Sequence, residues 1–255
     1  MASRCTALFF NLRISRMSDQ ILHSQVTPNP KTPSFWTRAQ WHQCEKDYLR
    51  SRPGIKRHFF AKRCLDLAVA SSGLALIWPL LLIVAIAIRL TSPGPALFRQ
   101  KRLGQKGQNF TIYKFRTMVD GAVNFGTGLR TFEGDPRITP LGKFLRDYHL
   151  DELPQLLNVL KGDMSLVGPR PLLPSELALY DSRQKQRLLV LPGMTAWEAV
   201  NGGLDNSREE RIDLDLWYVD HWNFWVDLRI IARTVLVVLR KEGLYEKSPN
   251  SRLID

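Results

Sequence analysis

Two adjacent carboxylates, Asp151 and Glu152, are the first candidates for chemistry in this sequence. Pro154 follows them and belongs in the first turn of a helix, so a helix is expected to begin at about residues 151–153 and to end at Gly162. Carboxylates at such a helix start stay ionised beside the positive end of the macrodipole. Capping is their ordinary role. The alternatives are joint binding of Mg²⁺, or a division into a nucleophile and a metal ligand.

Basic side chains at two other places could bind phosphate. Gly104 and Gly107 predict a turn between two short strands, and alternation on the second strand puts Lys114 and Arg116 on one face. Two cations on a rigid strand could clamp a diphosphate, although a solvated basic face is the commoner explanation. Farther along, a short apolar strand ends in a Gly-Pro-Arg-Pro turn, which would hold Arg170 in one direction.

Composition narrows the classes of partner. The chain has 36 Lys plus Arg against 24 Asp plus Glu, a net charge of +12, which attracts nucleic acid, an anionic membrane face or phosphorylated substrates. No Walker loop, Rossmann glycine pattern, HExxH or GxSxG is present, so the common routes of nucleotide, zinc and serine hydrolysis are poorly supported. The odd, widely spaced cysteines, Cys5, Cys44 and Cys64, indicate a reducing compartment.

A long apolar segment must position these groups. Residues 67–88 carry no charge and are about as long as the ~20 residues that cross a bilayer. Pro79 lies near the middle, where it breaks or kinks a helix. Both flanks are basic, which favours cytoplasm on both sides. A helix that turns at Pro79 and leaves by the same face fits these facts, and from the residues alone a kinked span fits equally well.

The C-terminal region suggests a second membrane contact. Aromatic side chains of the kind that favour the headgroup layer crowd one stretch: Trp217, Tyr218, Trp222, Phe224 and Trp225. An apolar helical pattern over residues 226–239 follows, with Arg229, Arg233 and Arg240 on one face. This pattern is typical of an interfacial amphipathic helix, and a helix packed on the protein's own core is the alternative. At the other end, a short apolar patch at residues 7–10 does not resemble a secretory signal, and polar residues 18–55 predict a loosely ordered extension.

Five ordered stretches carry a resemblance: Arg63-Cys-Leu-Asp66, Ser92-Pro-Gly-Pro95, Tyr113-Lys-Phe-Arg-Thr-Met118, Leu150-Asp-Glu-Leu-Pro-Gln155 and Lys161-Gly-Asp-Met-Ser-Leu-Val-Gly-Pro-Arg-Pro171. With Pro79, they resemble the small monotopic polyprenyl-phosphate glycosyl-1-phosphate transferases of the bacterial sugar transferase family, over about residues 62–239.

The resemblance implies an α/β fold, mostly helical with a few short strands. A re-entrant membrane helix hairpin and interfacial amphipathic helices would hold a compact catalytic domain on the cytoplasmic face of the bacterial inner membrane. The implied parts are a variable polar extension (1–55), the membrane helix broken at Pro79 (56–90), the catalytic domain with the amphipathic helices (91–245) and a tail (246–255).

The resemblance also implies roles for single residues. Asp151 would be the nucleophile, with Mg²⁺ at Asp151 and Glu152. Phosphate contacts would come from four basic residues, Lys114, Arg116, Arg146 and Arg170. Three further charged residues would serve the substrate or the structure: Arg137, Asp215 and Asp227.

The implied reaction moves a sugar 1-phosphate from a UDP-sugar to undecaprenyl phosphate through a phosphosugar on Asp151, and releases UMP. It would begin a lipid-linked glycan for exopolysaccharide, capsule, O-antigen or glycoprotein. Anionic membrane lipid and downstream glycosyltransferases are the further partners implied, and a monomer and a homodimer both fit the family. Nucleic acid is not expected as a partner, because nucleic-acid binding would not explain residues 67–88.

One stretch departs from the family pattern. Where the family has a glycine, a glutamine and an arginine after Pro192-Gly193, this chain has Ala196, Ala199 and Gly203. The missing arginine concerns nucleotide or sugar recognition, and Arg208 or Arg211 are candidates to replace it. The change predicts an unusual sugar donor. The alternative is a non-catalytic membrane-bound scaffold with a decayed donor site.

Overall fold

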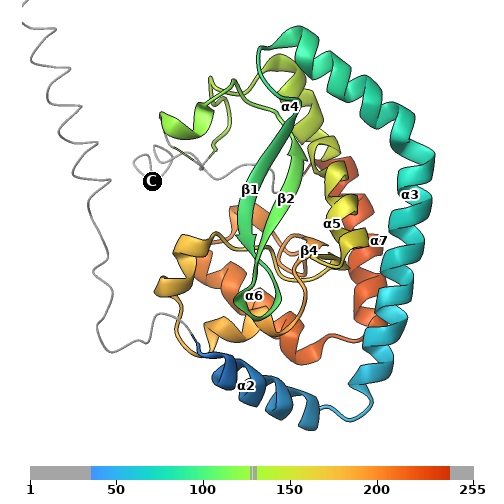
Figure 1. Ribbon diagram of the computed structural model, residues 1–255, viewed down its shortest axis with the longest axis vertical. Coiled ribbons are helices and arrows are strands. Elements are labelled where there is room, and N and C mark those ends of the chain that lie inside the picture. Colours follow the sequence, from blue (N-terminus) through green and yellow to red (C-terminus); the bar gives the residue numbers. More distant parts are fainter. Residues whose placement is uncertain (1–35, 127, 129–130, 242–255) are drawn as a thin grey trace, which may run out of the picture. The chain divides into compact units, whose positions relative to one another are not determined.

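Most of the described residues lie in α- or 3₁₀-helices, as the sequence predicts. The computed structural model describes residues 36–126, 128 and 131–241 (Figure 1). Its α-helices are α2 (Arg38–Arg50), α3 (Ile55–Thr91), α4 (Pro140–Asp147), α5 (Leu156–Lys161), α6 (Arg208–His221) and α7 (Phe224–Arg240). Its strands are β1 (Leu97–Leu103), β2 (Asn109–Phe115), β3 (Ser165–Val167) and β4 (Gly193–Thr195). Short 3₁₀ turns η1 to η6 connect them. The patch at residues 7–10, Cys5 and the tail at 246–255 lie outside the described residues.

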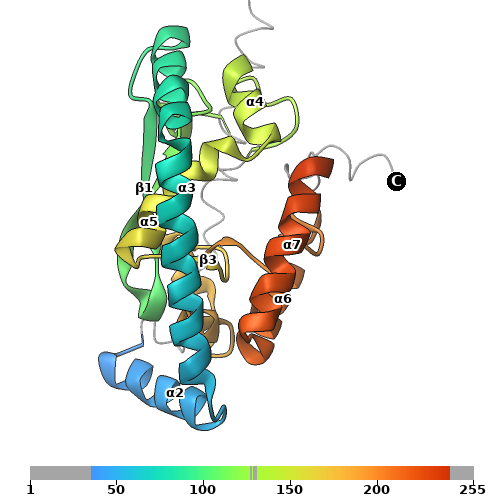
Figure 2. The ribbon, with the colours of Figure 1, turned by 90° about the vertical axis from the view of Figure 1, so that its right-hand side faces the viewer.

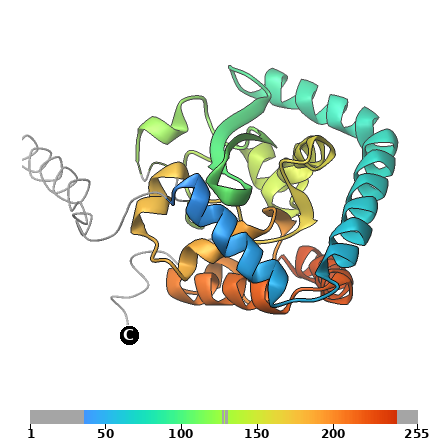
Figure 3. The same ribbon diagram turned by 60° about the horizontal axis from the view of Figure 1, so that its bottom comes forward.

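The long helix α3 contains the whole apolar segment. Among the described residues it is the one helix long and apolar enough to cross a membrane. Its backbone stays helical through Pro79, because one missing N–H removes a single bond of the ladder. The helix bends along its length instead of breaking (Figures 1 and 3). The sequence-based expectation of a break at Pro79 is therefore replaced by a bend, and the re-entrant path remains a prediction.

Polar side chains attach the first half of α3 to the remaining structure. Lys62 Nζ donates to the carbonyl of Val167 at 2.7 Å. Arg63 donates to the carbonyl of Val159 at 2.7 Å, at the end of α5. Asp66, which is 2% exposed, accepts from the backbone N–H of Leu166 at 2.9 Å. These bonds hold α3 against α5 and β3, while the second half of the helix exposes large apolar side chains, namely Leu76, Trp78, Leu80, Leu82, Ile83, Ile86 and Leu90.

The two predicted short strands form an antiparallel hairpin. β1 pairs with β2 in a register that sets Phe98 opposite Lys114, and the turn between the strands lies at η1 (Gln105–Gly107). Ile112 and Phe115 are buried beneath the hairpin. β2 is also tied to α5, because Asn158 accepts from the Tyr113 N–H at 3.1 Å. The hairpin therefore presents Lys114 toward the segment that precedes α5.

A second, parallel pair of strands holds the Gly-Pro-Arg-Pro turn. β3 pairs with β4, and the two backbones approach so closely that a Cβ on Gly168 would lie 2.3 Å from the carbonyl oxygen of Leu191. A Cβ on Gly193 would lie 2.1 Å from the backbone nitrogen of Gly168. Only glycine fits at both positions. The crossing fixes where the chain leaves β3 toward Arg170.

Part of the N-terminal extension is ordered, contrary to the expectation of a loose segment up to residue 55. α2 begins with a capping box between Thr37 and Gln40. Trp41 on α2 is 7% exposed and packs at the β1–β2 turn, next to Gly107. Tyr48 receives a hydrogen bond from the indole of Trp222 at 2.7 Å. Aromatic burial therefore folds this stretch, and Figure 3 shows α2 in front of the hairpin turn.

The aromatic residues near the C-terminus divide between the core and the surface. Tyr218 and Trp222 are almost fully buried, so the expectation that all five aromatic side chains face a membrane is wrong for these two. The rings pack between α2, α3, α6 and α7, and Figure 2 shows α7 beside α3, with α2 below them. Trp225 remains 72% exposed, and α7 also exposes apolar side chains, namely Val235, Leu236 and Leu239.

Candidate active site

Asp151 and Glu152 lie in a tight turn before α5. The sequence places the helix start at 151–153, but the structure forms the 3₁₀ turn η3 (Leu150–Gln155) first and begins α5 at Leu156. His149 enters η3 in the left-handed conformation, with φ of 53°. A 3₁₀ turn has three residues per turn, so neighbouring side chains point about 120° apart. The two carboxylates therefore face different surroundings, while Gly162 ends α5 as predicted.

Within the part of the chain that the structure describes, Glu152 forms an ion pair and Asp151 does not. The carboxylate of Glu152 forms an ion pair with Lys114 Nζ from β2. Burial raises the pKa of Glu152, but Lys114 and Arg170 outweigh this and lower it to about 2. Asp151 is 9% exposed, and burial raises its pKa to about 6 against the opposing attraction of Lys114. The adjacent groups thus differ in basicity: one is a fixed anion and the other a proton acceptor or nucleophile near neutral pH.

Two predicted phosphate-binding arginines converge on this carboxylate pair. Arg146 on α4 donates from Nε to the hydroxyl of Thr117 at 2.8 Å, and it lowers the pKa of Asp151. Although the Arg170 residue as a whole is exposed, neighbouring protein atoms desolvate its guanidinium and lower its pKa; Glu152 and other carboxylates outweigh this and raise it. Lys114, Arg146 and Arg170 thus all act electrostatically on the carboxylate pair, and their contacts with phosphate stay a prediction.

Two other predicted arginines bind the protein itself. Arg116 is 7% exposed and donates to the carbonyls of Ser92 and Pro93, just after α3 ends. Arg137 is 5% exposed, forms an ion pair with Asp135 at 2.7 Å and donates to backbone carbonyls of the loop before it. Both guanidinium groups therefore hold loops together. Phosphate binding by Arg116 and a substrate role for Arg137 stay predictions.

The two later acidic candidates form buried ion pairs. Asp215 on α6 is completely buried and pairs with Arg187. Burial raises the pKa of Asp215 to about 7 against the attraction of Arg187. Asp227 on α7 pairs with Lys62 at 2.6 Å and accepts from the hydroxyl of Tyr218 at 2.7 Å. Of the two, Asp215 lies near enough to raise the pKa of Arg170.

The donor set at the carboxylate pair fits a hard divalent cation. Mg²⁺ prefers oxygen ligands, and proteins often hold it by one or two carboxylates together with waters and substrate phosphates. Asp151 has no ion pair of its own among the described residues, so its oxygens are available. The described residues contain no cluster of three or more Asp, Glu, His or Cys side chains suited to a metal. The substrate would have to supply the remaining ligands.

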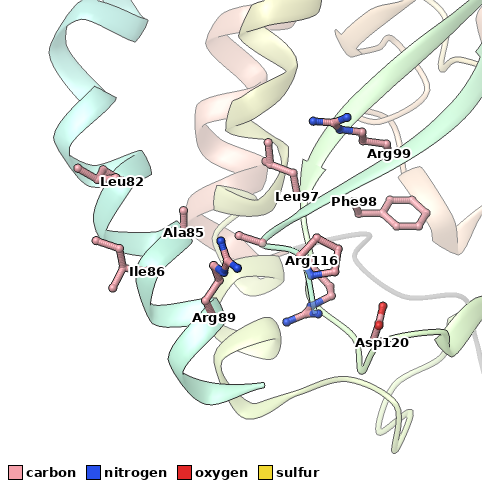
Figure 4. A pocket seen from close by; sticks show the side chains of 11 residues that line it. Leu82, Ala85, Ile86, Arg89, Leu97, Phe98, Arg99, Arg116 and Asp120 are labelled. Atoms are coloured by element: carbon pink, nitrogen blue, oxygen red, sulfur yellow. The ribbon is translucent and has the colours of Figure 1, made fainter. Parts of the chain in front are cut away.

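An amphiphilic groove lies next to these residues. Its volume is about 930 Å³, and side chains of α3 and β1 line its two sides (Figure 4). The apolar part of the lining is Leu82, Ala85, Ile86, Pro95, Ala96, Leu97 and Phe98. Arg89 and Arg99 add cations, and Arg116 with Asp120 closes one end. Phe98 is the cross-strand partner of Lys114, which relates the groove to the hairpin, although Lys114 and the carboxylate pair are not among its lining residues.

Several site residues were not singled out from the sequence. His149 lies against Glu152 and Arg170, and burial lowers its pKa. His149 directly precedes the stretch Leu150–Gln155 that contains the carboxylate pair, and this position is the signal that could have identified it. Glu198 is 3% exposed and also acts on Arg170. It lies within the stretch that departs from the family pattern, and the departure is the signal there.

Comparison with known proteins matches the chain to one family. The family model described as bacterial sugar transferase matches residues 56–241. The uncharacterized sugar transferase EpsL of Bacillus subtilis is 45% identical over 72% of this chain and 90% of its own length. The UDP-glucose:undecaprenyl-phosphate glucose-1-phosphate transferase of Xanthomonas campestris is 40% identical over 72% of this chain and 40% of its own length.

The exopolysaccharide production protein ExoY of Rhizobium meliloti is 37% identical over 72% of this chain and 88% of its own length. The chain thus matches nearly the whole of EpsL and ExoY, and about two fifths of the Xanthomonas protein. The matched region includes the anchored half of α3, the hairpin, η3 and the β3–β4 crossing, which together build the site. The chain therefore belongs to the bacterial sugar transferase family.

Proposed function

We propose that this chain transfers a sugar 1-phosphate from a UDP-sugar to a membrane polyprenyl phosphate. The observation that carries the proposal is the unequal carboxylate pair, in which Lys114 holds Glu152 as an anion while Asp151 stays free of an ion pair. Relatives named as UDP-glucose:undecaprenyl-phosphate and undecaprenyl-phosphate galactose transferases support the substrate class. Undecaprenyl phosphate is accordingly the expected acceptor. The expected product is a lipid-linked sugar that begins a glycan for exopolysaccharide, capsule, O-antigen or glycoprotein.

The reaction proceeds in two displacements. A carboxylate oxygen of Asp151 attacks the β-phosphorus, and the bond from that phosphorus to the oxygen bridging the two phosphates breaks, with its electron pair leaving on UMP. An oxygen of the acceptor's phosphate then attacks the same phosphorus. The acyl phosphate bond breaks, the polyprenyl-diphosphate sugar forms and Asp151 regains its carboxylate. A pKa of about 6 leaves Asp151 mostly ionised at pH 7.5, as a nucleophile requires.

The neighbouring side chains neutralise and orient the phosphates. Arg146 and Arg170 approach the pair from different elements and attract the diphosphate toward Asp151. Lys114 keeps Glu152 charged and oriented. Mg²⁺ bound by Asp151 and Glu152 would supply Lewis-acid neutralisation of the phosphate charge.

The acceptor would reach the site along the groove of Figure 4. Its apolar lining suits an isoprenoid chain, and its cations suit a phosphate head. The exposed apolar face of α3 continues away from the groove, where lipid would cover it. We accordingly place the protein on the cytoplasmic face of the inner membrane, with α3 entering and leaving by one side. Thiol labelling of Lys56→Cys and Leu90→Cys in sealed vesicles tests this path, since a re-entrant helix gives labelling of both from one side.

Release of UMP tests the reaction itself. The full chain would be held in nanodiscs with undecaprenyl phosphate, Mg²⁺ and UDP-glucose or UDP-galactose. UMP release is expected to need the lipid, to stop with EDTA and to stop in Asp151→Asn. Asp213→Asn, an exposed carboxylate on α6, is the matched control and should remain active. No UMP from a broad donor panel, with lipid binding retained, would contradict the proposal and favour a non-catalytic scaffold.

A further inference from the structure

A second group of buried polar atoms lies beyond Arg170. Eight buried side-chain nitrogen or oxygen atoms in the described residues have no hydrogen-bond partner, and five belong to this group. The five are Arg187 Nε, Glu198 Oε2, Arg208 Nη2, Arg211 Nε and Asp215 Oδ1. Folded proteins leave few such atoms, because each loses its hydrogen bonds to water. Their concentration in one place indicates a site that a polar ligand completes.

The five side chains are neighbours in space. Asp215 pairs with Arg187, and both Glu198 and Arg211 shift its pKa. The guanidinium groups of Arg187 and Arg208 lie over the same ring, that of Tyr180, at 5.7 and 5.0 Å from its centroid. Arg208 and Arg211 on α6 are half-buried, while Arg187, Glu198 and Asp215 are buried.

Arg170 connects this group to the carboxylate pair, and its backbone carbonyl accepts a hydrogen bond from Arg187 Nη2 at 3.2 Å. The carboxylates that raise its pKa are Glu152 and Asp151 on one hand and Glu198 and Asp215 on the other. A nucleotide sugar whose diphosphate meets Arg170 would therefore place one of its rings, glycosyl or ribosyl, beside Glu198. Those rings carry hydroxyl groups, which both donate and accept hydrogen bonds.

Glu198 is held rigidly in the stretch that departs from the family pattern. Its backbone carbonyl accepts from the N–H groups of Asn201 at 3.1 Å and Gly203 at 2.9 Å. Gly203 closes this turn with φ of 56°, a conformation that glycine adopts without strain. Trp197 beside it stacks on Trp217 with ring centroids 4.6 Å apart. The Glu198 carboxylate has no ion pair among the described residues, and its buried Oε2 has no hydrogen-bond partner there.

We propose that Glu198 is a specificity-determining residue of the donor site, whose carboxylate accepts a hydrogen bond from a hydroxyl on the glycosyl or ribosyl ring of the nucleotide sugar. The proposal rests on the proposed function. Glu198 is 3% exposed, so this side of the site contains a buried acid. Such a site selects for hydroxyl groups and rejects donors that lack them.

Binding measurements can distinguish whether Glu198 contacts the glycosyl or the ribosyl ring, and they do not require turnover. Calorimetry on full-length Asp151→Asn in nanodiscs with Mg²⁺ gives dissociation constants for UDP, 2′- and 3′-deoxy-UDP, UDP-glucose and UDP-galactose. The same dissociation constants are then measured for the double variant Asp151→Asn, Glu198→Gln. If Glu198 meets the glycosyl ring, the preference for a UDP-sugar over UDP falls by roughly 10- to 100-fold. If it meets the ribose, the preference for UDP over a deoxy-UDP falls instead.

The controls distinguish recognition from stability. Glu209→Gln removes an exposed carboxylate of α6 and should leave every preference unchanged. Glu198→Gln should not lower the melting temperature, because it removes a buried charge that has no ion pair. Unchanged preferences in Glu198→Gln would overturn the proposal and leave the proposed function intact. A lower melting temperature with uniform weakening of all ligands would also overturn it, and failure of UDP itself to bind would contradict both.

Discussion

Lys114 on β2 is in ion-pair contact with Glu152 in η3, although 37 residues separate them along the chain. The contact distinguishes Glu152 from Asp151 beside it, because the same cation lowers the pKa of Glu152 to about 2 while burial raises that of Asp151 to about 6. The roles proposed for the two carboxylates follow from this difference.

Substitution of the two carboxylates is expected to have unequal effects. Asp151→Asn should lower the rate of UMP release by about 10³-fold or more, because no group remains to form the acyl phosphate. Glu152→Gln should lower it by about 10- to 100-fold and raise the Mg²⁺ concentration needed for half-maximal rate. Quenched-flow assays with radiolabelled donor also detect the phosphosugar on the protein. Labelling that persists in Asp151→Asn would contradict the assignment.

The stability of the metal-free protein should depend on pH through Asp151. Its pKa is about 6 in the folded chain against 3.8 for a free aspartate. Ionisation is therefore disfavoured in the folded state, a penalty absent below about pH 4 and complete above about pH 6. In EDTA, Asp151→Asn should raise the melting temperature at pH 8 by several degrees and have little effect at pH 4. Equal shifts at both pH values would contradict the raised pKa.

The ion pair between Lys62 and Asp227 should be a major link between α3 and α7. Its side chains are 9% and 2% exposed, so removal of either partner leaves a buried charge. Lys62→Met alone is expected to destabilise the protein by about 3–5 kcal/mol. Adding Asp227→Asn should recover part of this loss. Thermal unfolding in detergent of the unmodified protein, the two single variants and the double variant measures the coupling energy. Losses of stability that add up would show that Lys62 and Asp227 are not coupled. Lys56→Met, an exposed lysine of the same helix, is the matched control.

Arg116 and Arg146 should respond differently to substitution. Arg116 holds the turn after α3, so Arg116→Lys should lower the melting temperature and affect the rate mainly through lost folded protein. Arg146→Lys should leave stability nearly unchanged and raise the KM for the donor or acceptor by about tenfold. Steady-state kinetics with both substrates, normalised to folded protein, make the comparison. If Arg116→Lys instead raised KM without lowering stability, Arg116 would contact the substrate.

Local patterns in the sequence were sufficient for several features. The hairpin around Gly104 and Gly107, the helix end at Gly162 and the short strand before Arg170 all depend on a few adjacent residues, and all are confirmed. The order of motifs was also enough to identify the family. Such features are readable because turn residues and strand alternation act over short distances.

Other features depended on contacts between distant segments. The fold of α2 comes from burial of Trp41 and Tyr48 against residues more than fifty positions later, so polarity alone misjudged this stretch. The burial of Tyr218 and Trp222 has the same origin. Alternation predicts Lys114 and Arg116 on one strand face, but β2 ends at Phe115. Arg116 binds the turn after α3, and Lys114 binds Glu152. Alternation specifies the face, and only packing decides which partner each side chain meets.

The sequence by itself determined the family, the apolar helix and the candidate carboxylates of this protein, because these are properties of residue type and spacing. Only the tertiary structure decided that Glu152 is paired and Asp151 is not, and that Glu198 lies with Asp215 near Arg170. The physical reason is that charge pairing and burial depend on distances between side chains that the fold brings together, and these distances set the pKa values and hydrogen bonds on which the chemistry relies.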